Sequence, residues 1–249
     1  MRKSPSAFRP PHVALAAPLF AALLAVIAPQ ARADEVDPEL VLLADASGSI
    51  DADEIAFQRR GYAEALTDPA VIGAIRGTLT GRIALTDVEW ASNQATVVDW
   101  TVIDGPESAA DFAARLVAPP RLALGRNAIG SALLHARALI EENDFQGLRG
   151  VIDFSGDSAN SWIGPPAAAA RATVLAAGIT ISGLPILCLD CASGPAQPDL
   201  LRRYDTEIIG GPGAFAIAVA GRDLFVEAVR RKLIPESAGG LPGDSAAAR

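Results

Sequence analysis

One short segment indicates the architecture of this chain: Glu39-Leu40-Val41-Leu42-Leu43-Ala44-Asp45-Ala46-Ser47-Gly48-Ser49. Its first six residues are almost wholly apolar and too few for a helix, a pattern typical of a strand buried on both faces of a sheet. In the next five, an aspartate and two serines alternate with small residues, and Gly48 permits a tight bend. The segment therefore predicts a central strand that ends in a cluster of oxygen-bearing side chains.

Beyond this segment, short apolar runs alternate with longer amphipathic stretches, which is typical of strand–helix units around a parallel sheet. Helices are expected at residues 51–66, 106–117, from 127 onward, at 165–177 and at 223–233. Strands are expected at 39–44, 150–154 and 179–187, with a hairpin at 82–90 and 94–103 and a further hairpin or edge strand within 206–220. The pattern predicts an α/β fold: a doubly wound, mostly parallel sheet flanked by helices, with one antiparallel edge strand.

The first 33 residues are typical of an export signal. Two basic residues open the segment, an apolar run covers 13–28, and Ala31-Arg32-Ala33 offers a small-x-small cleavage site. A membrane anchor is the alternative, but Pro18 interrupts the run, which is short for a helix that crosses a bilayer. We expect cleavage before Asp34, no membrane span in the mature chain, and a periplasmic or secreted protein.

The charge balance excludes one class of partner. The chain carries a net charge of −8, and removal of residues 1–33 takes away four basic residues and no acid, which leaves 17 basic and 29 acidic residues, a net charge of −12. A protein of this charge repels phosphate backbones and attracts cations. We therefore expect no nucleic-acid partner.

The mature chain is expected to fold as one domain. It has no internal repeat and no linker, and half of the full sequence is hydrophobic. The segment from Pro235 is small and polar, which predicts a disordered tail over 235–249. A single domain would then cover 34–234.

Both cysteines lie in Cys188-Leu189-Asp190-Cys191. This spacing fits a redox pair, half of a zinc site or a local disulfide. A zinc site would need two further soft ligands, and the mature chain offers only His135 besides the cysteines. Since exported proteins favour disulfides, we expect a bond between Cys188 and Cys191, with free thiols as the alternative.

Polar side chains follow two of the predicted strands and begin one of the predicted helices. In doubly wound sheets the ligand crevice lies at the carboxyl ends of the strands, where such side chains converge. The candidates are Asp45, Ser47 and Ser49 after the first strand, Arg126 and Asn127 at a helix start, and Asp157 and Ser158 after the strand ending at Phe154. Carboxylate, hydroxyl and amide oxygens are hard ligands, suited to Mg²⁺, Mn²⁺ or Ca²⁺.

Two plainer interpretations of the turn at 45–49 are open. A calcium-binding EF-hand loop would need Gly at its sixth place and Glu at its twelfth, where this chain has Ile50 and Ala56. Alternatively, Ser49 or Asp51 merely caps the helix that follows.

These residues resemble the metal-ion-dependent adhesion site of von Willebrand factor A-type domains. Asp45, Ser47 and Ser49 match its Asp-x-Ser-x-Ser element, Asn127 stands where that site has a Thr, and Asp157 matches its later Asp. The resemblance implies the same fold. It also implies a divalent cation, Mg²⁺ before Mn²⁺ or Ca²⁺, held by these five residues directly or through water.

More closely, the chain is similar to an uncharacterised family of exported von Willebrand A-like proteins from proteobacteria. The motifs that carry this similarity span nearly the whole mature chain: Gln58–Tyr62, Val88–Trp90, Val151–Asp157, Gly178–Pro185 and Ile209–Phe215. The similarity implies the fold, and it implies no activity.

The rim of the predicted crevice is expected to include Trp90, Ser158, Asn160 and Trp162. Core or loop packing is the alternative for the two tryptophans, because buried Trp commonly packs.

The function expected from the sequence is an exported binding module whose metal ion accepts a carboxylate from an unidentified partner protein. No paired base and nucleophile are recognisable, so we do not expect an enzyme. Two alternatives are open. One is a scaffold with a degenerate, metal-free site, because Asn127 replaces the Thr. The other is a metal-assisted hydrolase that recruits His135.

Overall fold

A computed structural model describes residues 34–187 and 199–239 of the chain. The predicted export signal, the Cys188–Cys191 pair and the last ten residues of the predicted tail lie outside the described residues.

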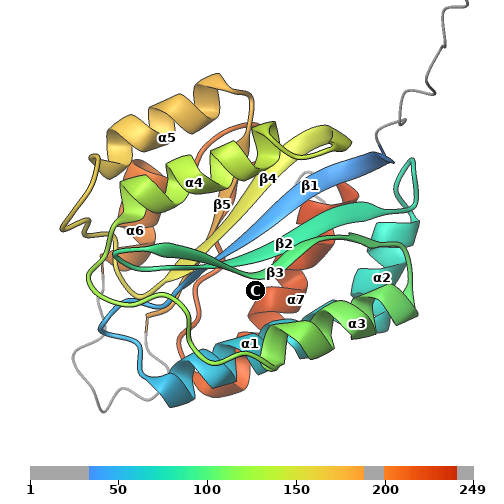
Figure 1. Ribbon diagram of the computed structural model, residues 1–249, viewed down its shortest axis with the longest axis horizontal. Helices are drawn as coiled ribbons and strands as arrows, with labels where there is room; N and C mark the ends of the chain where they lie inside the picture. The colour runs from blue at the N-terminus through green and yellow to red at the C-terminus, as the bar shows by residue number, and fades with distance from the viewer. Residues whose placement is uncertain (1–33, 188–198, 240–249) are drawn as a thin grey trace, which may run out of the picture. The chain divides into compact units, whose positions relative to one another are not determined.

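The described chain is built on one five-stranded sheet in the order β3-β2-β1-β4-β5 (Figure 1). Its strands are β1 (Asp34–Asp45), β2 (Ile83–Trp90), β3 (Gln94–Ile103), β4 (Phe145–Gly156) and β5 (Thr180–Pro185). The central strand β1 pairs in parallel with β2 and β4, and β4 pairs in parallel with β5. Only β3 is antiparallel, as the edge strand of the predicted hairpin with β2. The predicted sheet is confirmed.

Helices cover both faces of the sheet (Figure 1). One face carries α1 (Ala52–Leu66), α2 (Pro69–Arg76), α3 (Pro106–Val117) and α7 (Arg222–Ala238). The other carries α4 (Ile129–Glu141), α5 (Ala167–Ala176), α6 (Leu200–Arg203) and a π-helical turn, η1 (Tyr204–Ile208). This arrangement confirms the doubly wound α/β class.

Alternate residues of β1 enter separate hydrophobic cores. Leu40 and Leu42 pack on the side of α1 and α7, whereas Val41 and Leu43 pack on the side of α4 and α5. All four side chains are at most 1% exposed. Burial on both faces explains why residues 40–44 of this strand are wholly apolar, whereas its first half carries acids such as Asp37 and Glu39.

The residue that caps α1 is not one of the candidate ligands. Asp51 is the N-cap: it accepts a hydrogen bond from Glu54 N, and Glu54 reaches back to Asp51 N. This reciprocal capping box satisfies two amide groups that the helix itself leaves unbonded. Ser49 is therefore not needed as a cap and is available to the crevice.

The predicted hairpin or edge strand within 206–220 is wrong. Tyr204–Ile208 is π-helical, and the chain beyond it forms isolated bridges in place of a regular strand: Gly210 pairs with Ile181 and Ala216 with Gly183 of β5, and Val219 pairs with Ile186 just past its end. Two glycines with positive φ, Gly211 (98°) and Gly213 (71°), flank Pro212 and turn the chain away from a regular ladder.

The last helix is longer than predicted, which moves the start of the tail. We predicted a helix end at Leu233 and a disordered tail from Pro235, but α7 runs through Pro235 to Ala238 and ends at Gly239 in the left-handed conformation. Glu236 and Ser237 are buried, and Arg149 of β4 donates hydrogen bonds to their carbonyl oxygens. These tertiary contacts hold the last turn in spite of the proline.

Two short helices were not predicted, α2 and α6. The signal for α2 is visible in the sequence: Asp68 caps it through Ala70 N, and Pro69 occupies its first turn. Among the described residues, no helix is both long and apolar enough to cross a membrane.

The packing of α1 on α7 generates a prediction at Gly61. A Cβ atom at this position would lie 2.4 Å from the ring of Phe225, so Gly61→Ala is expected to lower the free energy of unfolding by about 1–3 kcal/mol. Urea denaturation measures the change. The matched control is Gly73→Ala in α2, where nothing lies within 4 Å and alanine is expected to raise stability by about 0.5–1 kcal/mol. A stabilised Gly61→Ala variant would contradict the packing of α1 on α7.

Candidate functional site

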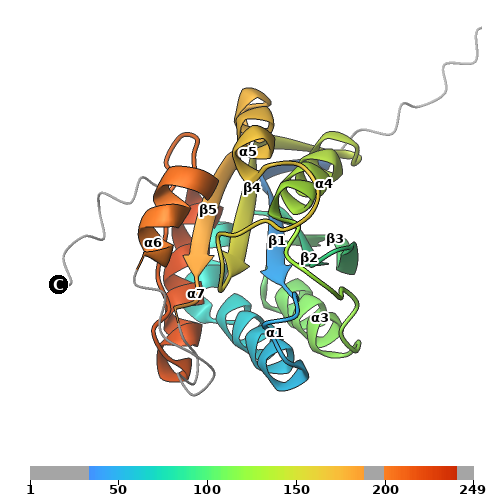
Figure 2. The same ribbon diagram turned by 90° about the vertical axis from the view of Figure 1, so that its left-hand side faces the viewer.

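Three loops meet over the carboxyl ends of the parallel strands. Figure 2 looks onto this edge of the sheet, where the loops after β1 and β4 and the loop before α4 come together. The crevice between them is lined by Gly48, Ser49, Gly125, Arg126, Asn127, Asp157, Ser158, Asn160 and Trp162. The three groups of polar residues that the sequence placed at one edge are thus neighbours.

Hydrogen bonds link four of the predicted ligands. Asp45 Oδ1 accepts a bond of 2.7 Å from Ser47 N. The Ser47 and Ser49 hydroxyls lie 3.2 Å apart, and Ser49 Oγ donates to Asp157 Oδ1 over 3.1 Å. The turn after β1 therefore reaches across to the loop after β4.

Asp45 is the most constrained of these side chains. It is 2% exposed, and its second oxygen, Oδ2, is buried without a hydrogen-bond partner. A Cβ atom on Gly156 would lie 2.7 Å from Oδ2, so a glycine at this position leaves room for the carboxylate. An unsatisfied carboxylate oxygen costs free energy unless another group neutralises it.

Burial disfavours the ionisation of both carboxylates. Burial, and after it the negative charge of Asp157, raise the pKa of Asp45 to about 7, while hydrogen bonds with Ser47 and the Asp157 backbone oppose the shift. Burial also raises the pKa of Asp157, although the hydrogen bond from Ser49 opposes the shift. A cation between them would favour both charged forms.

The residues present fit a hard cation. They offer two carboxylates, two hydroxyls and an amide, all oxygen donors of the kind that bind Mg²⁺ or Ca²⁺. Over residues 34–187 and 199–239 no group of three His, Cys, Asp or Glu side chains is gathered in one place. A site built here thus depends on neutral oxygens as well as on Asp45 and Asp157.

Asn127 sits at the junction of two loops. Its main-chain carbonyl oxygen accepts hydrogen bonds from Trp162 N (2.8 Å) and Ile163 N (3.4 Å). These bonds connect the loop after β4 to the loop before α4. The neighbouring Gly125 carbonyl accepts a bond of 2.8 Å from Gly48 N. The segment 125–127 therefore holds the turn after β1 on one side and the loop after β4 on the other.

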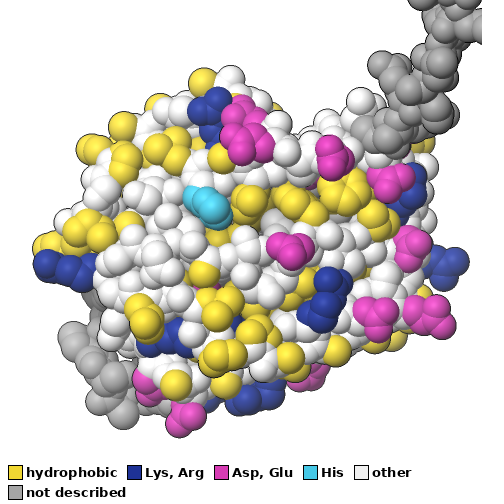
Figure 3. Space-filling view, in the orientation of Figure 1, with side chains coloured by type: hydrophobic (Ala, Val, Ile, Leu, Met, Phe, Trp, Pro, Cys, Tyr) yellow, Lys and Arg dark blue, Asp and Glu magenta, His cyan; other side chains and the backbone are white. Residues whose placement is uncertain are grey.

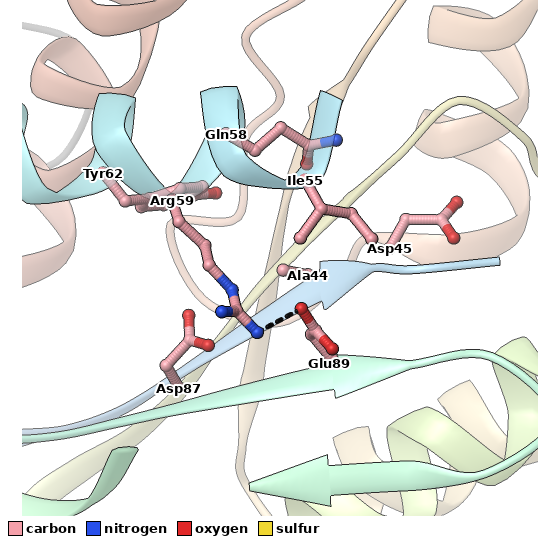
Figure 4. A pocket seen from close by; sticks show the side chains of 8 residues that line it. All are labelled: Ala44, Asp45, Ile55, Gln58, Arg59, Tyr62, Asp87 and Glu89. Carbon is pink, nitrogen blue, oxygen red and sulfur yellow. Dashed lines mark hydrogen bonds and ion pairs between the residues drawn. The ribbon is translucent and has the colours of Figure 1, made fainter. Parts of the chain in front are cut away.

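A buried ion pair between α1 and β2 holds the loop 119–123, which leads into this segment (Figure 4). The Arg59 guanidinium of α1 lies 2.5 Å from Glu89 Oε1 of β2, and both side chains are buried. Glu89 Oε2 accepts hydrogen bonds from Leu122 N and Ala123 N, while Arg59 donates to the carbonyls of Pro119 and Pro120. Sequence patterning left Arg59 as a surface charge or part of a salt bridge. Glu89 lies within the apolar strand β2, and an acid in such a strand indicates a buried basic partner, which is Arg59.

Arg121 connects the supported loop to the turn after β1. Its guanidinium donates to the carbonyl oxygens of Ala46, Ser47 (2.8 Å) and Ile50 (2.9 Å). It therefore spans the turn that carries the candidate ligands. Sequence reasoning missed Arg121, because only the folded loop brings it to this turn.

Of the two tryptophans predicted at the rim, Trp162 is exposed and Trp90 is buried. Trp162 is 60% exposed at the rim, and the Arg126 guanidinium lies 5.3 Å from its ring centroid. The expectation that Trp90 also lies at the rim is wrong. Its side chain is fully buried, stacks on Phe154 at 5.0 Å and donates from Nε1 to Ser155 O. Because Trp90 belongs to a strand enclosed by helices, its ring faces the core.

The other two rim candidates, Ser158 and Asn160, line the crevice. Ser158 Oγ accepts a bond from Asn160 N, and Asn160 Oδ1 accepts a bond of 2.9 Å from Arg203. His135, by contrast, does not line the crevice, and its Nε2 is buried without a partner. His135 therefore makes no hydrogen bond to a serine of the crevice, which a Ser-His hydrolase would need.

Comparison with protein families gives a match over residues 35–240 to the family described as "Protein of unknown function (DUF1194)". No curated protein matches the sequence.

Several solved structures share the fold. Proximal thread matrix protein 1 from the mussel byssus is 18% identical with a TM-score of 0.57, over 82% of this chain and 49% of the mussel chain. The pilus adhesin SpaC from Lactobacillus rhamnosus GG is 12% identical with a TM-score of 0.56, over 81% of this chain and 31% of SpaC. A von Willebrand factor type A protein from Catenulispora acidiphila is 15% identical with a TM-score of 0.54, over 82% and 43%.

These likenesses show a von Willebrand A fold. The chain spans about half of the mussel protein and less of the other two. One structure of the mussel protein is described as having a zinc-occupied MIDAS motif, the metal-ion-dependent adhesion site.

The role of Arg121 can be tested by removing its charge. Arg121→Met keeps much of the side-chain length but leaves the turn carbonyls without their donor, so the free energy of unfolding is expected to fall by about 2 kcal/mol. Chemical denaturation measures this. The matched control is Arg137→Met, which breaks an exposed ion pair with Glu141 and is expected to cost about 0.5 kcal/mol or less. Equal effects of the two substitutions would contradict a role for Arg121 in holding the turn.

Proposed function

The chain belongs to the DUF1194 family of unknown function, and on that premise we propose that it is an exported binding module with a divalent cation at the crevice. Asp45, Ser47, Ser49, Asn127 and Asp157 would hold the ion directly or through water. An open position on the ion would accept an acidic group of a partner protein.

The unpartnered Oδ2 of Asp45 carries this proposal. A buried carboxylate oxygen with no donor, beside a second carboxylate, is destabilising in the metal-free protein. Cation binding would compensate both charges at once. In a purely structural turn, no interaction would offset this destabilisation.

Mg²⁺ suits the donors best, because hard oxygen ligands with few carboxylates leave room for bound water. Mn²⁺ and Ca²⁺ accept similar donors. The zinc in the mussel relative supports a divalent ion at this place in the fold. Zinc itself prefers nitrogen and sulfur ligands, which the described crevice residues do not offer.

The rim suggests the chemistry of the partner. Trp162 is exposed beside Arg126, and the nearby loops expose Leu124 (60%) and Ile163 (38%). Trp and Arg are enriched among residues that dominate binding energy at interfaces. A protein segment whose carboxylate is flanked by bulky apolar side chains would match both the cation and this rim.

Protein partners suit the rest of the surface better than nucleic acids do. On the face drawn in Figure 3, acidic and basic side chains are interspersed, and the net charge is −8 for the full chain. Among proteins of the same fold, the mussel protein is described as a thread matrix protein and SpaC as a pilus adhesin. These relatives support a binding role outside the cytoplasm, in keeping with the export signal proposed for residues 1–33.

Two other functions have less support. A metal-free scaffold is favoured by Asn127, which stands where the adhesion site has a Thr, and by the irregular turn Ser155-Gly156-Asp157. A metal-assisted hydrolase would need a general base within reach of the crevice, and His135 does not line it.

Asp45→Asn tests the metal site. The variant keeps the shape of the side chain but removes the buried charge, so it should lose the stabilisation that Mg²⁺ or Mn²⁺ gives the parent in thermal denaturation. Without metal at pH 8, it should be more stable than the parent, by on the order of 2 kcal/mol. This gain should shrink as the pH falls from about 7 toward 4, because the pKa of Asp45 in the folded parent is about 7 and its carboxyl is then protonated, so the buried charge that the substitution removes is already gone.

Asp99→Asn is the control for this experiment. Asp99 is an exposed residue of β3, away from the crevice, and its substitution should change neither the metal response nor the pH dependence. A parent protein that melts at the same temperature with and without metal would refute the proposed site.

Asn127 separates the metal site from the metal-free scaffold. Asn127→Asp adds a third carboxylate and should tighten Mn²⁺ binding about tenfold, whereas Asn127→Ala should weaken it by a similar factor. Isothermal titration with Mn²⁺ measures both variants. If neither changes the affinity, Asn127 is not a ligand. No heat of binding in either variant or in the parent would favour the scaffold.

A further inference from the structure

A second pocket lies toward the amino ends of β4 and β5, away from the crevice. It has a volume of about 250 Å³ and lies between these two strands, the end of α7 and the turn 212–215. A cavity of roughly 150 Å³ lined by apolar side chains can hold a benzene ring, so this pocket has room for a small organic molecule. Its lining shares no residue with that of the crevice.

Arg149 of β4 brings a positive charge to this pocket. Its Nη2 atom donates to the carbonyl oxygens of Glu236 and Ser237 and so holds the end of α7. Its Nε and Nη1 atoms make no hydrogen bond to the described part of the chain, yet both keep accessible surface, unlike the buried Nε of Arg59. The donors that α7 does not use are therefore available to a ligand.

No described acid neutralises this guanidinium. Over residues 34–187 and 199–239, Arg149 forms no ion pair. Burial lowers the pKa of Arg149, and the more distant charges of Glu236 and Asp37 oppose the shift only in part. An arginine stays charged in proteins, so a partly desolvated one without a counter-ion is stabilised by an anion.

The other charges near the pocket largely cancel. Lys232 Nζ lies 2.6 Å from Asp153 Oδ1 and also contacts Glu236 Oε1, and all three side chains are buried. Burial and the charge of Asp153 raise the pKa of Glu236 to about 8, while Lys232 and Arg149 oppose the shift. Near pH 7 Glu236 is then mostly neutral, and Arg149 gives the pocket a net positive charge within a chain of net charge −8.

Much of the remaining wall is apolar. Val151 of β4, Pro212, Phe215 and Pro235 contribute hydrocarbon surface beside the guanidinium. Small-molecule sites commonly combine such walls with a few polar groups that fix the orientation of the ligand. A ligand that matches this pocket needs an apolar body as well as a negative charge.

From this combination we infer a second binding site, at Arg149, for a small monocarboxylate with a compact apolar body, such as an aromatic or branched aliphatic acid. The carboxylate would accept charge-assisted hydrogen bonds from the free nitrogens of Arg149. The hydrocarbon part would pack on Phe215 and the prolines. This site does not depend on the proposed metal site, because none of its residues lines the crevice.

Saturation-transfer NMR on the mature chain can test this site, with benzoate as the probe and benzamide and benzylamine as its neutral and cationic counterparts. The buffer is metal-free, because a carboxylate could also bind an ion in the crevice. We expect signal transfer to benzoate and little to the other two compounds. No transfer to benzoate would overturn the site, and equal transfer to benzamide would overturn the role of the charge.

Substitutions of the lining place the ligand in this pocket. Arg149→Gln removes the charge and should weaken benzoate binding about tenfold, whereas Arg149→Lys keeps the charge and should retain part of the affinity. Phe215→Leu removes apolar wall, leaves the contacts of Arg149 with α7 in place, and should also weaken binding. Unchanged affinity in Arg149→Gln and in Phe215→Leu would overturn the site.

Two variants of the crevice serve as controls. Arg126→Gln removes an arginine that lines the crevice, and Asp45→Asn removes the proposed metal ligand. Benzoate binding in metal-free buffer should persist in both, whatever the outcome for the metal. Loss of binding in Arg126→Gln, with Arg149→Gln unaffected, would place the carboxylate at the crevice and overturn the second site.

Discussion

The burial of β1 on both faces is the constraint on which the rest of the structure depends. Where two cores enclose the strand, at residues 40–44, its side chains must be apolar, so the carboxylate that can serve the crevice appears only where the chain leaves the sheet. That side chain is Asp45, which is still 2% exposed. The transition from strand to turn therefore sets a carboxylate at the boundary between the core and the crevice.

Buried ions connect the helices to this sheet at two places. Arg59 of α1 and Glu89 of β2 meet below the crevice and hold the loop that leads to Asn127. Lys232 of α7 meets Asp153 of β4 in the core between helix and sheet. Removing one member of such a pair leaves an uncompensated charge, so each pair strongly disfavours alternative packings of its helix.

The candidate site places two buried carboxylates between loops that are fixed by hydrogen bonds. Burial and the nearby charge of Asp157 raise the pKa of Asp45, while Arg121, Asn127 and Glu89 hold the surrounding loops through backbone hydrogen bonds. Supported loops cannot move apart to relieve the repulsion. The proposed cation would therefore meet donors that are already in place, which lowers the ordering cost of binding.

Much of this arrangement could be predicted from residue patterns. The apolar run at 39–44, the alternation in β2 and β3, and the position of Asp45, Ser49, Asn127 and Asp157 all follow from local periodicity together with the rule that strand ends converge. The sequence by itself determined the α/β class and four neighbouring polar groups at one edge. Only the tertiary structure decided the burial of Trp90 and Arg59, the reach of Arg121, the extension of α7 through Pro235 and the pairing around Lys232. Local patterns record the environment of each residue's own element, whereas these features depend on partners 30 or more positions away, which come close only in the folded chain.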